Sequence, residues 1–292
     1  MRVSRSEFIP IRGLNYHVRH WGSVGKPTLF MMHGWMDVSA SFQFVVDCLS
    51  ETWHVIAPDW RGFGLTGVEQ ADSFWFPDYL GDLDAILNYY ASDESVALLG
   101  HSMGGNVVSL YAGIRPHRVS RLINLEGFGM PVMVTEQAPS LYAKWLDELN
   151  DPVGLRTYAT REDVIARLQK NNSRLTNERA SFLADYWAAP NIEGRWEVLA
   201  HSAHKIISPL FYRVEEAMAC WKAIQAPVLW VEAEDSDVWK WIGHKGSAQA
   251  EMDRRVACIP NVTRRLIQHA GHMLHHDQPE ILAKMIEQFL AE

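Results

Sequence analysis

Short apolar runs alternate with amphipathic segments along most of this chain. The apolar runs, each bounded by turn residues, lie at 28–32, 54–57, 96–99, 122–125, 228–231 and 265–267. Continuous apolar strands of this kind are typical of parallel sheets that helices cover on both faces. Segments with the helical period lie between them, at 39–50, 77–90, 103–114 and 279–290. The alternation therefore predicts an α/β fold with a mostly parallel, doubly wound sheet.

This alternation stops between about residue 130 and residue 217. The segment contains no convincing buried strand, and its helix-like pieces lie at 141–149, 161–169 and 177–188, with Asn and Pro between them. A helical insertion between two strands of a parallel sheet would lie over the carboxyl edge of that sheet. We therefore predict a core of residues 1–129 and 218–292, and a helical cap of residues 130–217 that follows the strand ending at Glu126.

Composition narrows the class of protein. The chain has 292 residues, of which 48% are hydrophobic and 21% charged, as in ordinary globular proteins. Its net charge of −8 argues against nucleic acid or an anionic membrane as a partner, because both favour basic surfaces. The N-terminal segment lacks the apolar core of a secretory signal, and the three cysteines are scattered. We expect a cytoplasmic monomer or homodimer that acts on a small molecule.

The most informative segment is 96–105, with the sequence VALLGHSMGG. An apolar strand runs into Gly100-x-Ser102-x-Gly104 and then into a helix rich in small residues. A serine on such a sharp turn has a strained backbone, so the residues two positions before and after it must lack a bulky side chain. The N–H groups at the start of the helix can stabilise negative charge. The segment predicts that Ser102 is a nucleophile.

Two other segments would complete the site. The loop HGW at 33–35 follows an earlier strand and can place the backbone N–H of Trp35 beside that of Met103, which would form an oxyanion hole. His272 follows the last predicted strand and a glycine. An imidazole with an ordinary pKa near 6.5 is suited to moving protons, and we predict that His272 is the general base.

Other histidines surround the predicted base. His269, His275 and His276 are rivals for its role, and His272, His275 and His276 have the i, i+3, i+4 spacing of a helical metal site. No HExxH motif or acidic partner accompanies them, so we predict neither a metal nor another cofactor. We interpret His275 and His276 as the polar start of the terminal helix.

Four motifs resemble those of the α/β-hydrolase superfamily, in the order in which they occur there. They are HGW at 33–35, DWRGFG at 59–64, GHSMGG at 100–105 and AGHMLHHDQPE at 270–280. The segments HGWMDVSASF and RLQKNNSRLTNERASFL also resemble a narrower group, the serine hydrolase-like proteins. The resemblance covers nearly the whole chain and implies an α/β-hydrolase fold with a chain order of serine, acid and histidine in the catalytic triad.

The acid of the triad has two possible positions. In many members of the superfamily, an Asp stands three residues after a glycine that ends the strand following the cap. Here Ala233 replaces the glycine and Ser236 replaces the Asp, although Asp235 and Asp237 flank it. The other position is the end of the strand before the cap, where Glu126 resembles the acid of some haloalkane dehalogenases. A carboxylate after a buried strand is costly unless paired, so we favour Glu126, with Asp237 or Asp235 as the alternative.

The predicted reaction is two-step hydrolysis of a carboxylic ester through an acyl-enzyme. Haloalkane dehalogenases and epoxide hydrolases of this fold use an Asp nucleophile, which Ser102 cannot replace. Lactones, thioesters and carbon–carbon bonds are alternative substrates of the same triad, and a cofactor-free perhydrolase is an alternative activity. A non-catalytic binding protein is the alternative from another class. The residues that we expect near the substrate are Trp35, Phe128, Met130, Trp145, Trp187 and Trp196, and core packing is the other possible role of each tryptophan.

Overall fold

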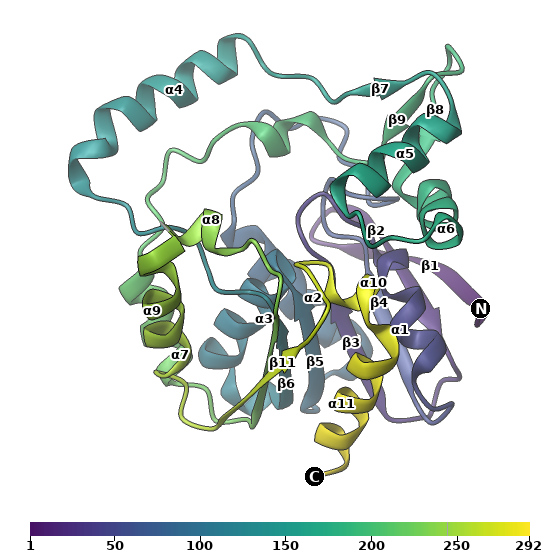
Figure 1. Cartoon of the computed structure of the whole chain (residues 1–292), viewed down its shortest axis with the longest axis vertical. Helices are drawn as coiled ribbons and strands as arrows, with labels where there is room; N and C mark the ends of the chain where they lie inside the picture. The colour runs from purple at the N-terminus through teal and green to yellow at the C-terminus, as the bar shows by residue number, and fades with distance from the viewer. Residues whose placement is uncertain (244) are drawn as a thin grey trace.

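The computed structural model describes residues 1–243 and 245–292, and a twisted eight-stranded sheet forms its centre (Figure 1). The strand order is β1-β2-β4-β3-β5-β6-β10-β11. The strands are β1 (Ser4–Ile11), β2 (Leu14–Trp21), β3 (Thr28–Met32), β4 (His54–Pro58), β5 (Val96–His101), β6 (Val119–Leu125), β10 (Val228–Ala233) and β11 (Val262–Ile267). Only the pairs β1–β2 and β2–β4 are antiparallel. The predicted mostly parallel sheet is confirmed.

Helices cover both faces of this sheet. They are α1 (Gln43–Cys48), α2 (Pro77–Ala91), α3 (Met103–Ile114), α7 (Val214–Lys222), α8 (Trp239–Ile242), α9 (Lys245–Val256), α10 (Leu274–Asp277) and α11 (Pro279–Ala291), with short 3-10 turns at Ser39–Phe42, Pro116–Arg118, Thr135–Gln137 and Ser202–Lys205. Helices α2, α3, α7 and α9 share one apolar cluster with the sheet, and α1 and α11 share the other. No helix within the described ranges has the length and apolar character that crossing a membrane requires.

The apolar runs of the central strands are continuous because both faces of the sheet are covered. In β10, Val228 and Trp230 belong to the cluster on one face, whereas Leu229 and Val231 belong to the cluster on the other. Successive side chains of a strand point to opposite faces, so a strand covered on both sides needs apolar residues at every position.

The N-terminal hairpin of β1 and β2 is absent from the elements that hydrophobic runs predict. Only Ile9 and Ile11 of β1 are buried apolar residues, so this edge strand lacks a continuous apolar run. Arg12 and Gly13 connect the strands with φ angles of 47° and 82°. Two successive left-handed residues form the tight turn that fits the twist of a hairpin.

The segment between β6 and α7 gathers above the carboxyl ends of the parallel strands (Figure 1). It contains α4 (Ala138–Asn150), β7 (Thr157–Tyr158), α5 (Arg161–Asn171), α6 (Asn177–Trp187), β8 (Ala188–Pro190) and β9 (Trp196–Val198). The three helices were expected from the sequence. The small β7-β9-β8 sheet was not, because strands of two or three residues are too short to show a period. The division into core and cap remains a prediction.

Backbone contacts at the end of β5 depend on two glycines. A Cβ atom on Gly100 would lie 2.3 Å from the carbonyl oxygen of Gly104, and one on Gly104 would lie 2.1 Å from the carbonyl oxygen of Met32. Both distances are far below van der Waals contact, and both obstacles are backbone atoms that cannot rotate away. The first turn of α3 therefore packs directly on the ends of β3 and β5.

We expect Gly104→Ala to destabilise the fold by about 3 kcal/mol or more, because the added methyl group forces the start of α3 away from β3. Gly67→Ala is the matched control, since a Cβ there meets nothing within 4 Å. Urea unfolding followed by circular dichroism measures both, and soluble yield reports a variant that does not fold. Equal midpoints for the two variants would contradict this account of the packing.

Candidate active site

Ser102 stands between β5 and α3 in a strained conformation, with φ 52° and ψ −114°. Side chains with a Cβ rarely adopt positive φ, so the surrounding structure must hold it. Its N–H donates to the carbonyl oxygen of Leu125 at 2.8 Å, and its own carbonyl accepts from the Asn106 N–H at 2.9 Å. These two bonds fix the serine between the neighbouring strand β6 and the first turn of α3.

The loop after β3 lies against this turn. A Cβ on Gly34 would be 3.0 Å from Nδ1 of His101 and 3.2 Å from the Cβ of Ser102, so the loop packs closely on the serine turn. Among the described residues, neither the Trp35 N–H nor the Met103 N–H donates to a backbone or side-chain acceptor. An oxyanion hole requires backbone donors without an internal partner, and these two N–H groups meet that requirement.

His272, after β11, lies beside a carboxylate from β6. Its Nδ1 is 3.3 Å from Oε2 of Glu126, which directly follows β6 and is only 2% exposed. Glu126 has a φ of 60°, and its Oε1 accepts a hydrogen bond of 2.7 Å from the Ala233 N–H. Its Oε2 also accepts from the hydroxyl of Ser236. The structure thus brings Glu126 and His272 together, with Nε2 as the remaining ring nitrogen.

The two alternative acids have other partners. Asp235 forms an ion pair of 2.7 Å with Arg174, and Asp237 forms one of 2.9 Å with Lys240. Both carboxylates are exposed by about half, at 48% and 50% of their side-chain surface. Neither is hydrogen-bonded to His272 within the described part of the chain.

Burial favours the neutral form of both members of the Glu126–His272 pair. It raises the pKa of Glu126 to about 7, although the hydrogen bonds from Ser236 and Ala233 act in the opposite direction. It lowers the pKa of His272 to about 4, against the attraction of Asp237 and Asp37. At neutral pH the imidazole is therefore uncharged, which is the form that accepts a proton.

Three side chains beyond those predicted from the sequence hold this arrangement. The Nε2 of His101 donates to the carbonyl oxygen of His272 at 2.8 Å. The Asn124 side-chain amide accepts from the Gly127 N–H at 2.8 Å and donates to the Gly105 carbonyl at 3.1 Å, which ties the end of β6 to α3. The ring of Trp241 packs edge-on at 4.8 Å from that of His272. One signal was available, because Asn124 is a polar residue inside an otherwise apolar strand.

The rival histidines lie elsewhere. His275 and His276 are buried in α10, and both Nε2 atoms contact the hydroxyl of Ser41, at 3.0 and 2.6 Å. Our interpretation of them as a polar helix start was wrong, because they pack inward against η1 (Ser39–Phe42) and not toward solvent. His269 is exposed, and its backbone N–H donates to Glu234.

The aromatic candidates for the substrate site are dispersed. Phe128 is 1% exposed and packs in the core against Trp230, with ring centroids 5.4 Å apart. Trp35 is 52% exposed, and Met130 is also exposed. Trp187 donates through its indole N–H to the carbonyl oxygen of Met36 at 2.8 Å, which connects α6 to the loop after β3.

Two further tryptophans lie elsewhere in the inserted segment. Trp145 belongs to α4, which stands away from the sheet (Figure 1), and Trp196 belongs to β9. Trp35 and Trp187, in contrast, lie on or against the loop after β3.

Comparison with known proteins identifies the family and the fold. A sequence model of the family described as alpha/beta hydrolase fold matches residues 27–279. A serine hydrolase-like protein of Danio rerio is 25% identical over 303 residues, covering 99% of this chain and 90% of that protein. Serine hydrolase-like protein 2 of Homo sapiens is 23% identical over 285 residues, covering 92% and 88%. The thioesterase domain from the curacin biosynthetic pathway shares the fold, with a TM-score of 0.83 at 22% identity and coverage of 98% and 99%.

The family match spans most of the chain, and the mostly parallel sheet and the serine turn are those that the sequence predicts. Serine hydrolase-like proteins are among the relatives that are similar over nearly the full length, as the narrower resemblance indicated. The chain belongs to the alpha/beta hydrolase fold family.

Proposed function

We propose that this hydrolase cleaves carboxylic esters through a triad of Ser102, His272 and Glu126. One observation carries the proposal. The Nδ1 of His272 lies 3.3 Å from Oε2 of the buried Glu126, and Ser102 stands nearby in a strained conformation. A buried carboxylate paired with a neutral imidazole is what general-base activation of a hydroxyl requires.

In this mechanism, the Oγ of Ser102 attacks the ester carbonyl carbon while Nε2 of His272 takes the hydroxyl proton. The backbone N–H groups of Trp35 and Met103 stabilise the oxyanion of the tetrahedral intermediate. The carbon–oxygen bond to the alcohol then breaks, and His272 passes its proton to the departing oxygen. Water attacks the acyl-enzyme by the same route, releasing the acid and restoring the serine.

Glu126 orients the base and stabilises its charged form. Its Oε2 faces Nδ1 of His272, so an ionised Glu126 holds the proton on Nδ1 and leaves the lone pair on Nε2. Within the described residues no hydrogen bond joins Ser102 to His272. We expect this bond to form when substrate binds, because catalytic hydrogen bonds often tighten only in the complex.

The segment 130–217 is proposed as a cap that bounds the acyl site. Its Trp187 bonds to the carbonyl oxygen of Met36, one residue after the proposed oxyanion donor Trp35. The exposed Trp35 side chain lies on that same loop, so an apolar acyl group would contact both the loop and the cap.

Ester hydrolysis is favoured over alkyl transfer because the nucleophile is a hydroxyl and not a carboxylate. We expect Ser102→Ala to reduce kcat by at least about 10⁴-fold on every ester that the wild type hydrolyses. The test is a panel of p-nitrophenyl esters of increasing acyl length, with a lactone, a thioester and a peroxide-dependent assay included. Turnover by the alanine variant equal to that of the wild type would exclude Ser102 as the nucleophile.

Glu126→Gln should reduce kcat/KM by about 10³- to 10⁴-fold, because the amide stabilises the wrong tautomer of His272. Asp237→Asn is the matched control and should stay near the wild-type value, since Asp237 is exposed and pairs with Lys240. The reverse result, a near-normal glutamine variant and a defective asparagine variant, would assign the acid to Asp237.

The same glutamine variant should not lose stability at pH 8. The folded state holds the Glu126 proton more tightly than the unfolded chain, since burial raises the pKa of Glu126 from 4.5 to about 7. Its ionisation therefore costs stability progressively as pH rises from about 4.5 to 7, by about 3 kcal/mol in total. A melting temperature of Glu126→Gln well below wild type at pH 8 would contradict this.

Activity should fall as pH decreases through about 7, because protonation of the pair removes the carboxylate that supports His272. With the pKa of His272 lowered to about 4, the imidazole itself remains neutral over this range. The measurement is kcat/KM between pH 5 and 9 in wild type and Glu126→Gln. The wild type should show this acid limb and the variant should lack it, whereas a wild-type profile that is flat down to pH 5 would refute the assignment.

A further inference from the structure

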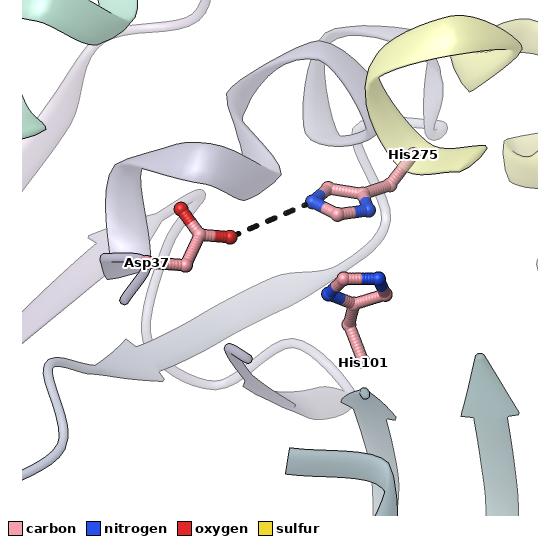
Figure 2. A group of neighbouring side chains, drawn as sticks. All are labelled: Asp37, His101 and His275. Atoms are coloured by element: carbon pink, nitrogen blue, oxygen red, sulfur yellow. Dashed lines mark ion pairs between the residues drawn. The ribbon is translucent and has the colours of Figure 1, made fainter. Parts of the chain in front are cut away.

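A second group of polar side chains lies behind the proposed triad. Asp37, His101 and His275 come from the loop after β3, the end of β5 and α10, and they converge on one point (Figure 2). One nitrogen or oxygen atom from each lies within 4.8 Å of the other two. All three residues are buried, with exposures of 8%, 2% and 0%.

His101 presents an unshared lone pair to this group. Its Nε2 bonds to the carbonyl oxygen of His272, which only accepts, so Nε2 carries the ring proton. In a neutral ring Nδ1 is then an acceptor. Within the described part of the chain, this buried Nδ1 has no hydrogen-bond partner.

Asp37 presents a second unshared lone pair to this group. Its Oδ1 accepts from the Val38 N–H at 2.9 Å, whereas its Oδ2 is buried without a hydrogen bond among the described residues. The Nε2 of His275 lies 3.8 Å from this Oδ2, too far for a hydrogen bond, and 3.0 Å from the Ser41 hydroxyl, a contact that it would exchange for an ion. Two unsatisfied acceptors in one buried cluster are costly unless a cation or a donor joins them.

The protein itself does not supply that cation. Among the described residues, no lysine or arginine side chain pairs with Oδ2 of Asp37 or Nδ1 of His101. Imidazole nitrogens and an aspartate oxygen are groups that bind a transition metal.

We propose that Asp37, His101 and His275 form a binding site for a divalent transition-metal ion, with Zn²⁺ the best match to two imidazoles and one carboxylate. Zinc sites commonly contain three protein ligands of these types. The proton on Nε2 of His101, shared with the His272 carbonyl, is the outer hydrogen bond that metal-binding histidines usually make.

The cluster must contract slightly to hold the ion. Tetrahedral zinc with bonds of about 2.1 Å places its ligand atoms roughly 3.4 Å apart. The Asp37–His275 pair, at 3.8 Å, is already close to that spacing. The widest pair, at most 4.8 Å, must close by up to roughly 1.4 Å when the ion binds.

An ion in this site would join three loops that the proposed reaction uses. Asp37 lies two residues after Trp35, His101 directly precedes Ser102, and His275 lies three residues after His272. Zinc would therefore hold these three loops together next to the proposed triad and would raise the melting temperature of the protein. Binding can be measured without any activity assay, so it is tested separately from the proposed hydrolysis.

The experiment uses the full chain, dialysed first against a chelator and then against ZnCl₂, desalted, and analysed for metal by mass spectrometry. We expect about one zinc ion per wild-type chain, with a higher melting temperature than the chelated protein. Asp37→Asn and His275→Gln should each lose the ion and the thermal shift. His117→Gln, which changes an exposed histidine, is the matched control and should keep both.

Far-UV circular dichroism of each variant establishes that it is folded. Substitution of Zn²⁺ by Co²⁺ adds a second readout, because a tetrahedral site with nitrogen and oxygen ligands gives visible absorption that the two ligand variants should lack. Zinc content that is the same in wild type, Asp37→Asn and His275→Gln would overturn the proposal. It would also fail if the wild type retained no zinc, in which case a water satisfies the two acceptors.

Discussion

The turn at Ser102 exists because two glycines let backbone meet backbone. Gly100 and Gly104 allow the first turn of α3 to pack on the ends of β3 and β5, and the serine between them takes up the positive φ that results. Ser102 is then held by a hydrogen bond to Leu125 of β6. The ends of these strands lie at one edge of the sheet, so residues that follow different strands meet there. This close packing is the constraint on which the proposed chemistry depends.

The proposed acid is supported by a residue at the other position that the fold offers for an acid. Ser236 stands at that position, after β10, and its hydroxyl donates to Glu126, which follows β6. The buried carboxylate thereby gains two donors, Ser236 and the Ala233 N–H, and faces His272. Burial of the ionised Glu126 lowers the stability of the folded state. Such a loss of stability is common at sites whose residues serve a function.

Much of the fold could be predicted because strands buried on both faces leave a continuous apolar signature, as in β3, β5 and β10. The β1–β2 hairpin and the β7-β9-β8 sheet left none, because β1 is an edge strand, β2 contains the buried polar residues His17, Arg19 and His20, and the strands of the small sheet have only two or three residues. Within the site, Ser102 and Glu126 were signalled by local pattern. His101 and His275 were not recognised as neighbours, because no local pattern connects residues that lie 174 positions apart in the sequence. Their meeting with Asp37 is a result of the tertiary structure alone.

The central claim is that Ser102 is a nucleophile activated by His272. The most direct measurement is reaction of the folded protein with a fluorophosphonate, followed by peptide mapping by mass spectrometry. The account predicts a single adduct on Ser102 in the wild type, and greatly slowed labelling in His272→Gln. Folded wild-type protein that stays unlabelled, or that carries its adduct on a different residue, would contradict it.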